Sequence, residues 1–402
     1  MRNVVLIFIV LFVLSCAGPN TDSECKPGEI TDSRDLPENI PGETMGQKLE
    51  SLLFWNQEEK ERRFSKMHII YPSIAVPVGK ASRLESGIKI QPKWDDYNIN
   101  SYMEENRVGG LIVVHNNKVV LEEYADGFDE NTLWTSYSVA KSISSMLVGV
   151  ALKNGDIKSM DDKLEAYIPE FKGKDYGQVT VEQLLTMTSG IAWNEDYVDA
   201  NSDVAQMYQK PCDGEEAHIL TYMKDLKSTN NPGEVWNYST GETDLVGILV
   251  QKASGMSLGE YLSEFIWKPF GMQTCGYWLA DECSNLNIGG SGLSASLRDY
   301  AKLGLLMLDD GKINGESIFA DSWLENATKS LYSTDEAEGG YGYLWWRNAD
   351  GSYLAQGIFG QMLYINPEKN LVISQYAAWP LAGSEELSQK RIEMINAVIA
   401  EI

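Results

Sequence analysis

The clearest hydrophobic pattern of the chain lies between residues 138 and 155. Apolar side chains recur there at intervals of three and four residues, which is the spacing of one face of an α-helix. These positions are Val139, Ile143, Met146, Leu147 and Val150. Asn154-Gly155 then supplies a stop signal, because glycine readily adopts the left-handed conformation that ends many helices. The pattern predicts a helix that begins at Ser138 and stops at Asn154-Gly155.

Two β-rich runs come shortly before this helix. Residues 110–115 read Gly-Leu-Ile-Val-Val-His, residues 118–124 read Lys-Val-Val-Leu-Glu-Glu-Tyr, and Asn116-Asn117 separates them. Two such runs around a short asparagine turn predict a β-hairpin. Ser138 would therefore follow directly after the edge of a sheet.

The remaining pattern places helices in the middle of the chain and strands near its end. Helical spacing dominates between about 156 and 335, with breaks rich in glycine and proline. Strand-like runs return after residue 340, and an amphipathic helix is expected at about 385–399. We predict one domain over residues 46–402, with an α/β core at about 46–155 and 336–402 and a mostly helical insertion at about 156–335. The site is expected in a cleft between these two parts.

The N-terminus has the pattern of a targeting segment. Arg2 precedes an apolar run at residues 4–14 that is too short to span a bilayer, and Ser15-Cys16-Ala17 follows. Residues 13–16 resemble a bacterial lipoprotein signal, in which the cysteine is lipidated. This predicts a signal peptide at residues 1–15, lipidation of Cys16, and an exported protein anchored to a bacterial membrane on the periplasmic or cell-surface side. A simple cleaved secretory signal is the alternative.

Residues 16–45 are rich in Pro, Gly, Ser, Asp and Glu and contain few apolar residues, a composition typical of a flexible tether. Five cysteines define no disulfide framework. Cys16 is assigned to the lipid and Cys25 to the tether, which leaves Cys212, Cys275 and Cys283. A pair between Cys275 and Cys283 is open for an exported protein, but spacing alone does not select it.

The net charge of the chain argues against two classes of binding partner. The formal net charge is −25, so nucleic acid and anionic membrane surfaces would repel the chain. Membrane contact is therefore expected only through the lipid anchor. The histidines at 68, 115 and 218 lack ligand spacing and leave little room for a Ser-His-Asp triad. A serine activated in this chain would depend on lysine or tyrosine.

Ser-x-x-Lys occurs three times, at Ser23-Lys26, Ser86-Lys89 and Ser138-Lys141. Only the third copy opens a predicted helix, where residues three apart share a face. The first turn also gathers unpaired N–H groups and the positive end of the helix dipole. Ser138 would then have an amine within reach and an anion site beside it. The competing interpretation is a helix cap with a solvated lysine.

Two further positions are candidates for the same cleft. Tyr238 lies in a break directly before a predicted helix, and Gly357 lies beside a predicted strand. A glycine there permits close approach of another backbone or a ligand, and the N–H of Ile358 would point into the cleft. Taken alone, each position also fits an ordinary packing role.

In this order, the motifs resemble those of the serine β-lactamase and penicillin-recognition superfamily. They are Ser138-Val-Ala-Lys141, residues 181–190, Pro232-Gly233 with Tyr238-Ser239, Pro269-Phe-Gly-Met272, and residues 357–361. Residues 297–304 and 341–346 resemble the branch that holds class C β-lactamases, esterases and 6-aminohexanoate-dimer (nylon-oligomer) hydrolases. The resemblance implies a β-lactamase-like α/β fold, with a central antiparallel sheet flanked by N- and C-terminal helices and an inserted, mostly helical subdomain.

The resemblance also implies roles for particular residues. Ser138 would be the nucleophile, Lys141 the base that takes its proton, and Tyr238 the group that passes a proton to the leaving atom. The backbone N–H groups of Ser138 and Ile358 would form the oxyanion hole. This chemistry requires no metal and no organic cofactor.

Two departures narrow the expected substrate. At the motif around Gly357 the chain reads Ala355-Gln356-Gly357, without the cation that holds a substrate carboxylate in β-lactamases. At the motif around Tyr238, Thr240 stands where those enzymes have asparagine. The sequence therefore favours a hydrolase of modest-sized amides or esters. The alternatives are a β-lactamase or DD-peptidase that acts on cell-wall-type substrates, and a catalytically silent binding protein.

Four positions are expected to touch the small-molecule substrate. Trp193, Asp196 and Tyr197 follow a Thr-Ser-Gly turn in the insertion that should roof the cleft, and Gly357 lies beside the predicted strand.

Overall fold

The computed structural model describes residues 25–36, 52–209, 214, 216–334 and 337–402. The predicted signal peptide and Cys16 lie outside these ranges. Within them, each helix is too short or too polar to cross a membrane.

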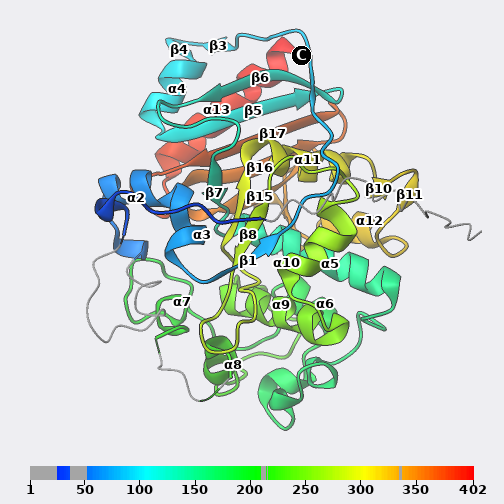
Figure 1. The fold of residues 1–402 in the computed structure, drawn as a ribbon. Coiled ribbons are helices and arrows are strands. Elements are labelled where there is room, and N and C mark those ends of the chain that lie inside the picture. Colours follow the sequence, from blue (N-terminus) through cyan, green and yellow to red (C-terminus); the bar gives the residue numbers. More distant parts are fainter. Residues whose placement is uncertain (1–24, 37–51, 210–213, 215, 335–336) are drawn as a thin grey trace, which may run out of the picture.

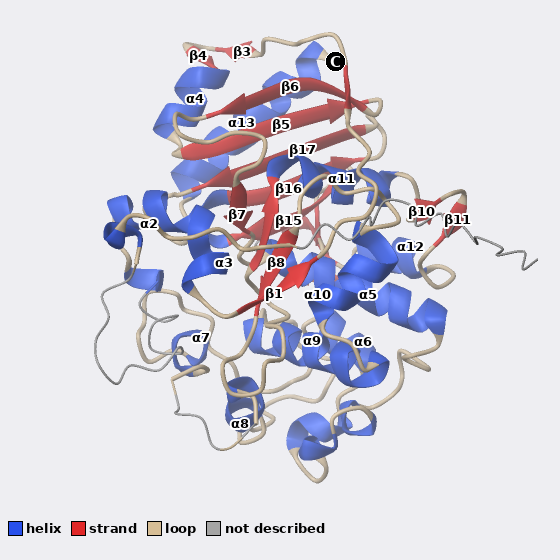
Figure 2. Ribbon diagram, in the orientation of Figure 1, coloured by secondary structure: helices blue, strands red, loops and turns tan. Residues whose placement is uncertain are grey.

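One large sheet forms the upper part of the molecule (Figures 1 and 2). Its neighbouring strands are antiparallel except β2, which joins β6 in parallel. In spatial order the strands are β12 (Tyr332–Thr334), β13 (Ala337–Tyr341), β14 (Trp346–Arg347), β15 (Tyr353–Gly357), β16 (Gln361–Asn366), β17 (Leu371–Ala377), β5 (Val108–His115), β6 (Lys118–Tyr124) and β2 (Glu85–Ser86). Because β17 pairs with β5, the two ends of the chain meet at the centre of the sheet. The large sheet is therefore built from segments near both ends of the chain.

The predicted hairpin is confirmed in β5 and β6. His115 pairs with Lys118, and the two turn residues Asn116 and Asn117 have φ values of 49° and 62°. Asparagine tolerates this left-handed conformation better than most residues, which suits a tight turn between twisted strands. β5 is buried along almost its whole length because β17 and β6 flank it and helices cover the sheet.

Helices cover both faces of the large sheet. α11 (Leu297–Leu308) packs against β16, β17 and β5, and a Cβ added at Gly304 would come within 2.6 Å of Val372, so the helix lies very close to the sheet. On the other side lie α4 (Ile99–Glu105) and α13 (Glu385–Glu401), which contact one another (Figure 1). A central sheet flanked by N- and C-terminal helices is therefore confirmed.

The lower part of the molecule is built around two packed helices, α5 (Val139–Asn154) and α9 (Thr240–Ser254). Shorter helices surround them (Figure 1). They are α6 (Val181–Leu185), α7 (Asp203–Gln206), α8 (His218–Met223), α10 (Leu258–Leu262) and α12 (Trp323–Thr328). α5 ends as predicted, with Gly155 at φ 76°.

The inserted segment, predicted to be mostly helical, also contains strands. It contributes β8 (Gly276–Leu279) and β9 (Leu293–Ser296) to a second sheet, in which they pair with β1 (Ser73–Val76) and β7 (Leu133–Thr135). All four residues of each inserted strand are buried. β8 and β9 also pair with each other, and both are too short for their local sequence to distinguish them from the surrounding loops. The small sheet positions the start of α5, because β7 leads directly to it.

At the N-terminal end of the described chain, residues 25–36 contact the folded body, although composition predicts a tether there. Asp35 is buried and forms ion pairs with Arg62 at 2.7 Å and Lys66 at 2.5 Å. Arg62 belongs to α2 (Gln57–Arg63), and Lys66 directly precedes α3 (Met67–Ile70). These two ion pairs hold the N-terminal segment against the helical part that follows it.

Candidate active site

Ser138 sits at the sharp turn between β7 and α5. Tyr137, directly before it, has φ 43°, a left-handed conformation that is uncommon for a bulky residue. Tyr137 is buried and packs edge-on against Phe64 and Phe359, so the surrounding core holds this conformation in place. Ser138 is the residue before the helix, yet its side chain makes no capping hydrogen bond. Its hydroxyl therefore remains available for other contacts.

Lys141 reaches the Ser138 hydroxyl, as the helical spacing predicts. Its Nζ lies 2.9 Å from Ser138 Oγ, 2.8 Å from Thr240 Oγ1 and 3.1 Å from the carbonyl oxygen of Gly290. The Gly290 carbonyl is fixed in turn, because Gly290 N–H donates to Asp244 Oδ1 at 2.7 Å. The competing interpretation of a solvated lysine is wrong, since the Lys141 side chain is 1% exposed.

Burial also changes the acidity of Lys141. It lowers the pKa of the ammonium from its usual 10.5 to about 8, while the nearby carboxylates of Glu195 and Asp244 oppose this shift and raise the pKa. A lysine with a pKa near 8 holds a substantial neutral fraction at slightly alkaline pH. Such an amine can accept a proton, which an ordinary surface lysine cannot do at that pH.

Glu195 is a site residue that the sequence did not reveal. Its carboxylate accepts the backbone N–H of Thr240 at 2.9 Å and the Tyr197 hydroxyl at 2.7 Å. It also accepts hydrogen bonds from the Thr240 hydroxyl and the Trp193 indole N–H. These hydrogen bonds join the loop that carries Glu195 to the first residue of α9. Local sequence offers no signal for this role, because the contact spans 45 residues.

Tyr238 lies beside Lys141 in the loop before α9, where the sequence placed it. Its ring centre is 5.1 Å from Lys141 Nζ, and the ring stacks on Trp346 at 5.5 Å. Ser138 and Tyr238 line the same cleft. The structure thus brings together the serine, the lysine and the tyrosine that the motifs selected.

Gly357 brings the end of β15 against the turn that holds Ser138. A Cβ added at Gly357 would lie 2.6 Å from the Ser136 carbonyl oxygen and 3.1 Å from Ser138 N, so no larger residue fits without movement. Among the described residues, neither Ser138 N–H nor Ile358 N–H donates to a loop or side-chain acceptor. Two free backbone donors therefore flank the Ser138 hydroxyl, an arrangement that can hold a developing oxyanion.

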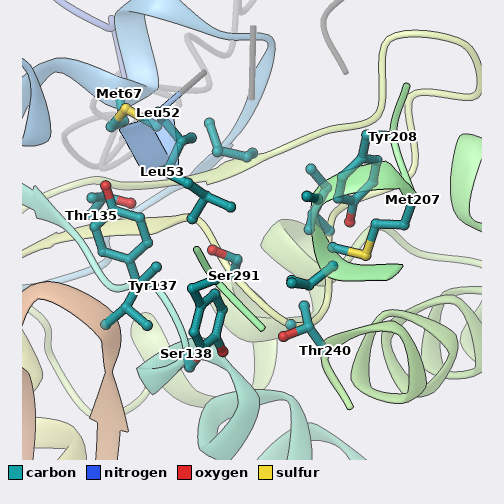
Figure 3. A pocket seen from close by; sticks show the side chains of 17 residues that line it. Leu52, Leu53, Met67, Thr135, Tyr137, Ser138, Met207, Tyr208, Thr240 and Ser291 are labelled. Carbon is teal, nitrogen blue, oxygen red and sulfur yellow. The ribbon is translucent and has the colours of Figure 1, made fainter. Parts of the chain in front are cut away.

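Two cavities meet at Ser138. The first has a volume of about 80 Å³ and a mostly apolar lining, with Leu53, Met207 and Ile288 among its walls (Figure 3). The second is an open cleft of about 500 Å³. Ser138, Tyr197 and Ile358 line both. A group bound at Ser138 can thus extend in two directions.

Three of the four predicted substrate contacts line the open cleft. These are Asp196, Tyr197 and Gly357. Trp193 lines neither cavity: it is buried, donates to Glu195 and packs edge-on against Tyr222. Its position indicates that it holds the Glu195 carboxylate in place through this hydrogen bond.

Away from this cleft, three side chains of metal-binding types lie close together, but one of them cannot act as a ligand. His218, Asp281 and Cys283 place ligand atoms within 4.8 Å of one another. Cys283 is disulfide-bonded, however, so it has no thiolate to offer a metal.

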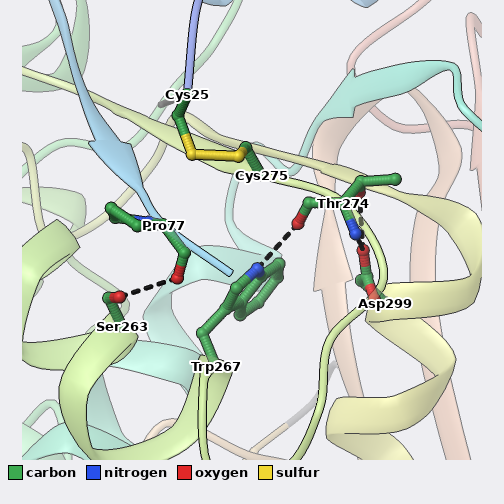
Figure 4. The surroundings of a disulfide bond; sticks show 7 residues. All are labelled: Cys25, Pro77, Ser263, Trp267, Thr274, Cys275 and Asp299. Carbon is green, nitrogen blue, oxygen red and sulfur yellow. Dashed lines mark hydrogen bonds between the residues drawn. A yellow bond between two sulfur atoms is a disulfide. The ribbon is translucent and has the colours of Figure 1, made fainter. Parts of the chain in front are cut away.

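Cys275 forms a disulfide with Cys25, so the pair between Cys275 and Cys283 that the sequence left open does not form (Figure 4). The backbone at Cys275 is held by its neighbour, because Thr274 donates its N–H and its hydroxyl to Asp299. The bond closes 250 residues of sequence and attaches the N-terminal segment to the lower part of the molecule. Spacing could not reveal a partner so distant.

Known proteins are similar to this chain in sequence and in fold. A 6-aminohexanoate-dimer hydrolase from Paenarthrobacter ureafaciens is 27% identical over 369 residues, which cover 86% of this chain and 91% of that protein. The solved structure "Putative 6-aminohexanoate-dimer hydrolase from Bacillus anthracis" superposes with a TM-score of 0.74 at 24% identity, covering 85% of this chain and 93% of the other. A family VIII carboxylesterase structure gives a TM-score of 0.58 at 17% identity, covering 75% and 95%.

The two structural likenesses establish the fold, and they confirm the β-lactamase-like architecture that the motifs imply. The sequence profile of the Beta-lactamase family matches residues 96–387, well over half of the chain and including every motif that converges on the cleft. This chain therefore belongs to the Beta-lactamase family of hydrolases.

Proposed function

We propose that this protein is an exported serine hydrolase that cleaves an amide or ester bond through an acyl-enzyme on Ser138. The observation that carries the proposal is the buried contact of 2.9 Å between Lys141 Nζ and Ser138 Oγ, beside two free backbone donors. A serine hydroxyl is a poor nucleophile until a neighbouring base takes its proton, and Lys141 is the group placed to do so.

Charged Lys141 donates one hydrogen bond each to Ser138 Oγ, Thr240 Oγ1 and the Gly290 carbonyl, and once it is neutral it can turn its lone pair toward the Ser138 hydroxyl. Thr240 gives its hydroxyl proton to Glu195, so its oxygen can only accept from Lys141. The Gly290 carbonyl likewise only accepts. Both N–H bonds of a neutral amine are thereby used, and the lone pair remains for the Ser138 hydroxyl. Glu195 acts here as a positioning residue, through Thr240.

Acylation then proceeds as follows. Lys141 takes the proton of Ser138 Oγ while the oxygen attacks the substrate carbonyl carbon, and the carbonyl π electrons move to its oxygen. The N–H groups of Ser138 and Ile358 hold this oxyanion. The bond from the carbonyl carbon to the leaving nitrogen or oxygen breaks, and its electron pair stays on the leaving atom. That atom receives the proton from Lys141 by way of the Tyr238 hydroxyl.

Deacylation repeats the sequence with water as the nucleophile. Lys141 and Tyr238 take one proton from water as its oxygen attacks the ester carbonyl. The bond between the carbonyl carbon and Ser138 Oγ then breaks, and Ser138 regains its proton. The products are a carboxylic acid and a free amine or alcohol.

Hydrolysis of 4-nitrophenyl butyrate tests this proposal. The purified wild type should release nitrophenol, and Ser138→Ala should lose at least about 1000-fold in kcat/KM. Ser86→Ala is the matched control, because Ser86 begins another Ser-x-x-Lys copy and lies on the edge strand β2. Equal rates for wild type and Ser138→Ala would overturn the proposal.

Export and the lipid anchor form a separate part of the proposal. Arg2, the apolar run at 4–14 and Cys16 motivate it, and the disulfide between Cys25 and Cys275 supports it, since such bonds persist mainly in oxidising compartments. The full-length protein should fractionate with membranes, and Cys16→Ala should move it to the soluble fraction. A Cys16→Ala protein that stays with membranes would contradict lipidation at this cysteine.

A further inference from the structure

Two bulky residues in left-handed backbone conformations flank the two proposed oxyanion donors. Tyr137 directly precedes Ser138 and has φ 43°. Phe359 directly follows Ile358 and has φ 61°. This region disfavours bulky side chains, so such residues persist there only when their surroundings hold them. Both side chains are buried, and the packing around their rings therefore controls the backbone on which the donors lie.

The two rings pack against each other and against a third ring, that of Phe64. The ring centres of Tyr137 and Phe359 are 5.3 Å apart. Phe64, which directly follows α2 and is fully buried, lies 5.0 Å from the first ring and 5.3 Å from the second. Aromatic rings at these separations attract one another beyond the burial of their area. The three rings form an aromatic cluster that joins the turn before α5 to the turn after β15.

The turn after β15 is also held by the side chain of Gln361, which begins β16 and is 2% exposed. Its Nε2 donates to the carbonyl oxygens of Ile358 and Phe359, each at 3.2 Å, and to that of Ala377 at 2.7 Å. Its Oε1 accepts the N–H of Ala377, in β17, at 3.1 Å. Unpaired backbone groups are costly when buried, so this amide fixes the turn Ile358–Gly360 against β17.

Phe64 and Gln361 line neither of the two cavities at Ser138. They can thus act on the reaction only through the backbone that they hold. An oxyanion hole depends on donors that are in place before the charge develops, because donors that must reorient lose part of their stabilising effect. A misplacement of about 1 Å can cost on the order of 100-fold in rate.

We infer that Phe64 and Gln361 are positioning residues of the oxyanion hole. Phe64 holds the two turns that carry the donors together through the aromatic cluster, and Gln361 holds the turn that carries Ile358. The inference rests on the hydrolase proposed above and deepens it, because it assigns the placement of both donors to side chains that lie outside the cleft.

The test uses two substrates that differ in one atom. 4-Nitrophenyl butyrate has a carbonyl oxygen, and O-(4-nitrophenyl) thionobutyrate has sulfur in its place. Sulfur is a weak acceptor on a longer bond, so donors fixed for oxygen stabilise it poorly. Each kcat/KM is divided by the rate constant for hydroxide-catalysed hydrolysis of the same compound, which removes intrinsic reactivity. Wild type should then prefer the oxygen ester by at least about 100-fold, the contribution of one oxyanion donor.

Phe64→Leu and Gln361→Met remove the two supports separately. Each should lower kcat on 4-nitrophenyl butyrate about 10- to 100-fold with little change in KM, since the weakened interaction is made mainly in the transition state. The preference for oxygen over sulfur should fall by about the same factor. The pH at which kcat/KM is half-maximal should stay at the wild-type value, because Lys141 keeps its three hydrogen-bond partners.

Phe319→Leu is the matched control for folding. Phe319 is 1% exposed, packs against Trp323, and lines neither cavity at Ser138. Its replacement removes a similar amount of buried aromatic surface, so Phe319→Leu and Phe64→Leu should both lower the free energy of unfolding in chemical denaturation. Only Phe64→Leu should change kcat and the preference for oxygen. Gln361→Met tests the other support with all three rings left in place.

The outcomes are distinguishable. A loss of kcat together with a loss of the preference for oxygen, at an unchanged pH midpoint, supports the inference for the residue replaced. Wild-type kcat, a loss of kcat that keeps the preference or moves the midpoint, or an equal loss in Phe319→Leu overturns it. The hydrolase proposal then still stands, provided that Ser138→Ala is inactive. A wild type that hydrolyses 4-nitrophenyl butyrate no faster than Ser138→Ala overturns both.

Discussion

The carboxylate of Glu195 accepts two hydrogen bonds from Thr240, one from its backbone N–H at 2.9 Å and one from its hydroxyl. Thr240 occupies the position where penicillin-directed relatives carry asparagine, and it also accepts from Lys141 at 2.8 Å. Thr240 therefore links the Glu195 carboxylate to the Lys141 amine through hydrogen bonds, without a direct contact between Glu195 and Lys141. This link orients Lys141, while the Glu195 charge raises the pKa of Lys141 against the effect of burial.

Replacing Glu195 should therefore impair the chemical step rather than the fold. In Glu195→Gln the amide can donate to Thr240, which frees the threonine hydroxyl proton to compete for the Lys141 lone pair. We expect kcat on 4-nitrophenyl butyrate to fall about 10- to 100-fold, part of what general base catalysis contributes. Glu234→Gln, an exposed carboxylate in the same part of the molecule, is the control. Unchanged kcat in Glu195→Gln would show that Thr240 does not depend on Glu195.

The pH dependence should report Lys141. Only its neutral form can take the serine proton, and its pKa is about 8. Below this value kcat/KM should fall about tenfold per pH unit, and above it the rate should level off. Because the Glu195 charge raises this pKa, Glu195→Gln should move the midpoint to lower pH. A profile that is flat from pH 6 to 9, or a midpoint that moves upward in the variant, would contradict this assignment.

Gly357→Ala should damage the oxyanion site. Its Cβ would lie 2.6 Å from the Ser136 carbonyl oxygen and 3.1 Å from Ser138 N, so the strand end or the turn must shift. We expect kcat to fall about 100-fold, comparable to the loss of one oxyanion donor. Gly28→Ala is the control, since its Cβ would meet only Ile69 at 3.5 Å. Wild-type kcat in Gly357→Ala would mean that this close approach is not required.

The disulfide between Cys25 and Cys275 should stabilise the fold without taking part in catalysis. Changing both cysteines to serine should lower the free energy of unfolding by about 2–4 kcal/mol, measured by chemical denaturation. The kcat of the folded variant should stay at the wild-type value, because neither cysteine lines a cavity at Ser138. Identical denaturation curves would show that the N-terminal segment adds no stability.

Local patterns were enough to predict α5 and the hairpin of β5 and β6. They did not by themselves select Ser138, Lys141 and Tyr238, which became candidates through the order of the motifs along the chain and the family that this order resembles. The residues that sequence missed act across longer separations. Glu195 is one of 58 acidic residues and meets Thr240 only because the loop folds back on α9.

The nucleophilic role of Ser138 is the central claim about this protein. The decisive measurement is mass spectrometry of the full-length protein after treatment with a fluorophosphonate, followed by peptide mapping of the adduct. We predict a single adduct on the peptide that contains Ser138, with loss of 4-nitrophenyl butyrate hydrolysis in proportion to labelling and no adduct in Ser138→Ala. An adduct on a different residue, or full hydrolysis by the Ser138→Ala protein, would contradict the account.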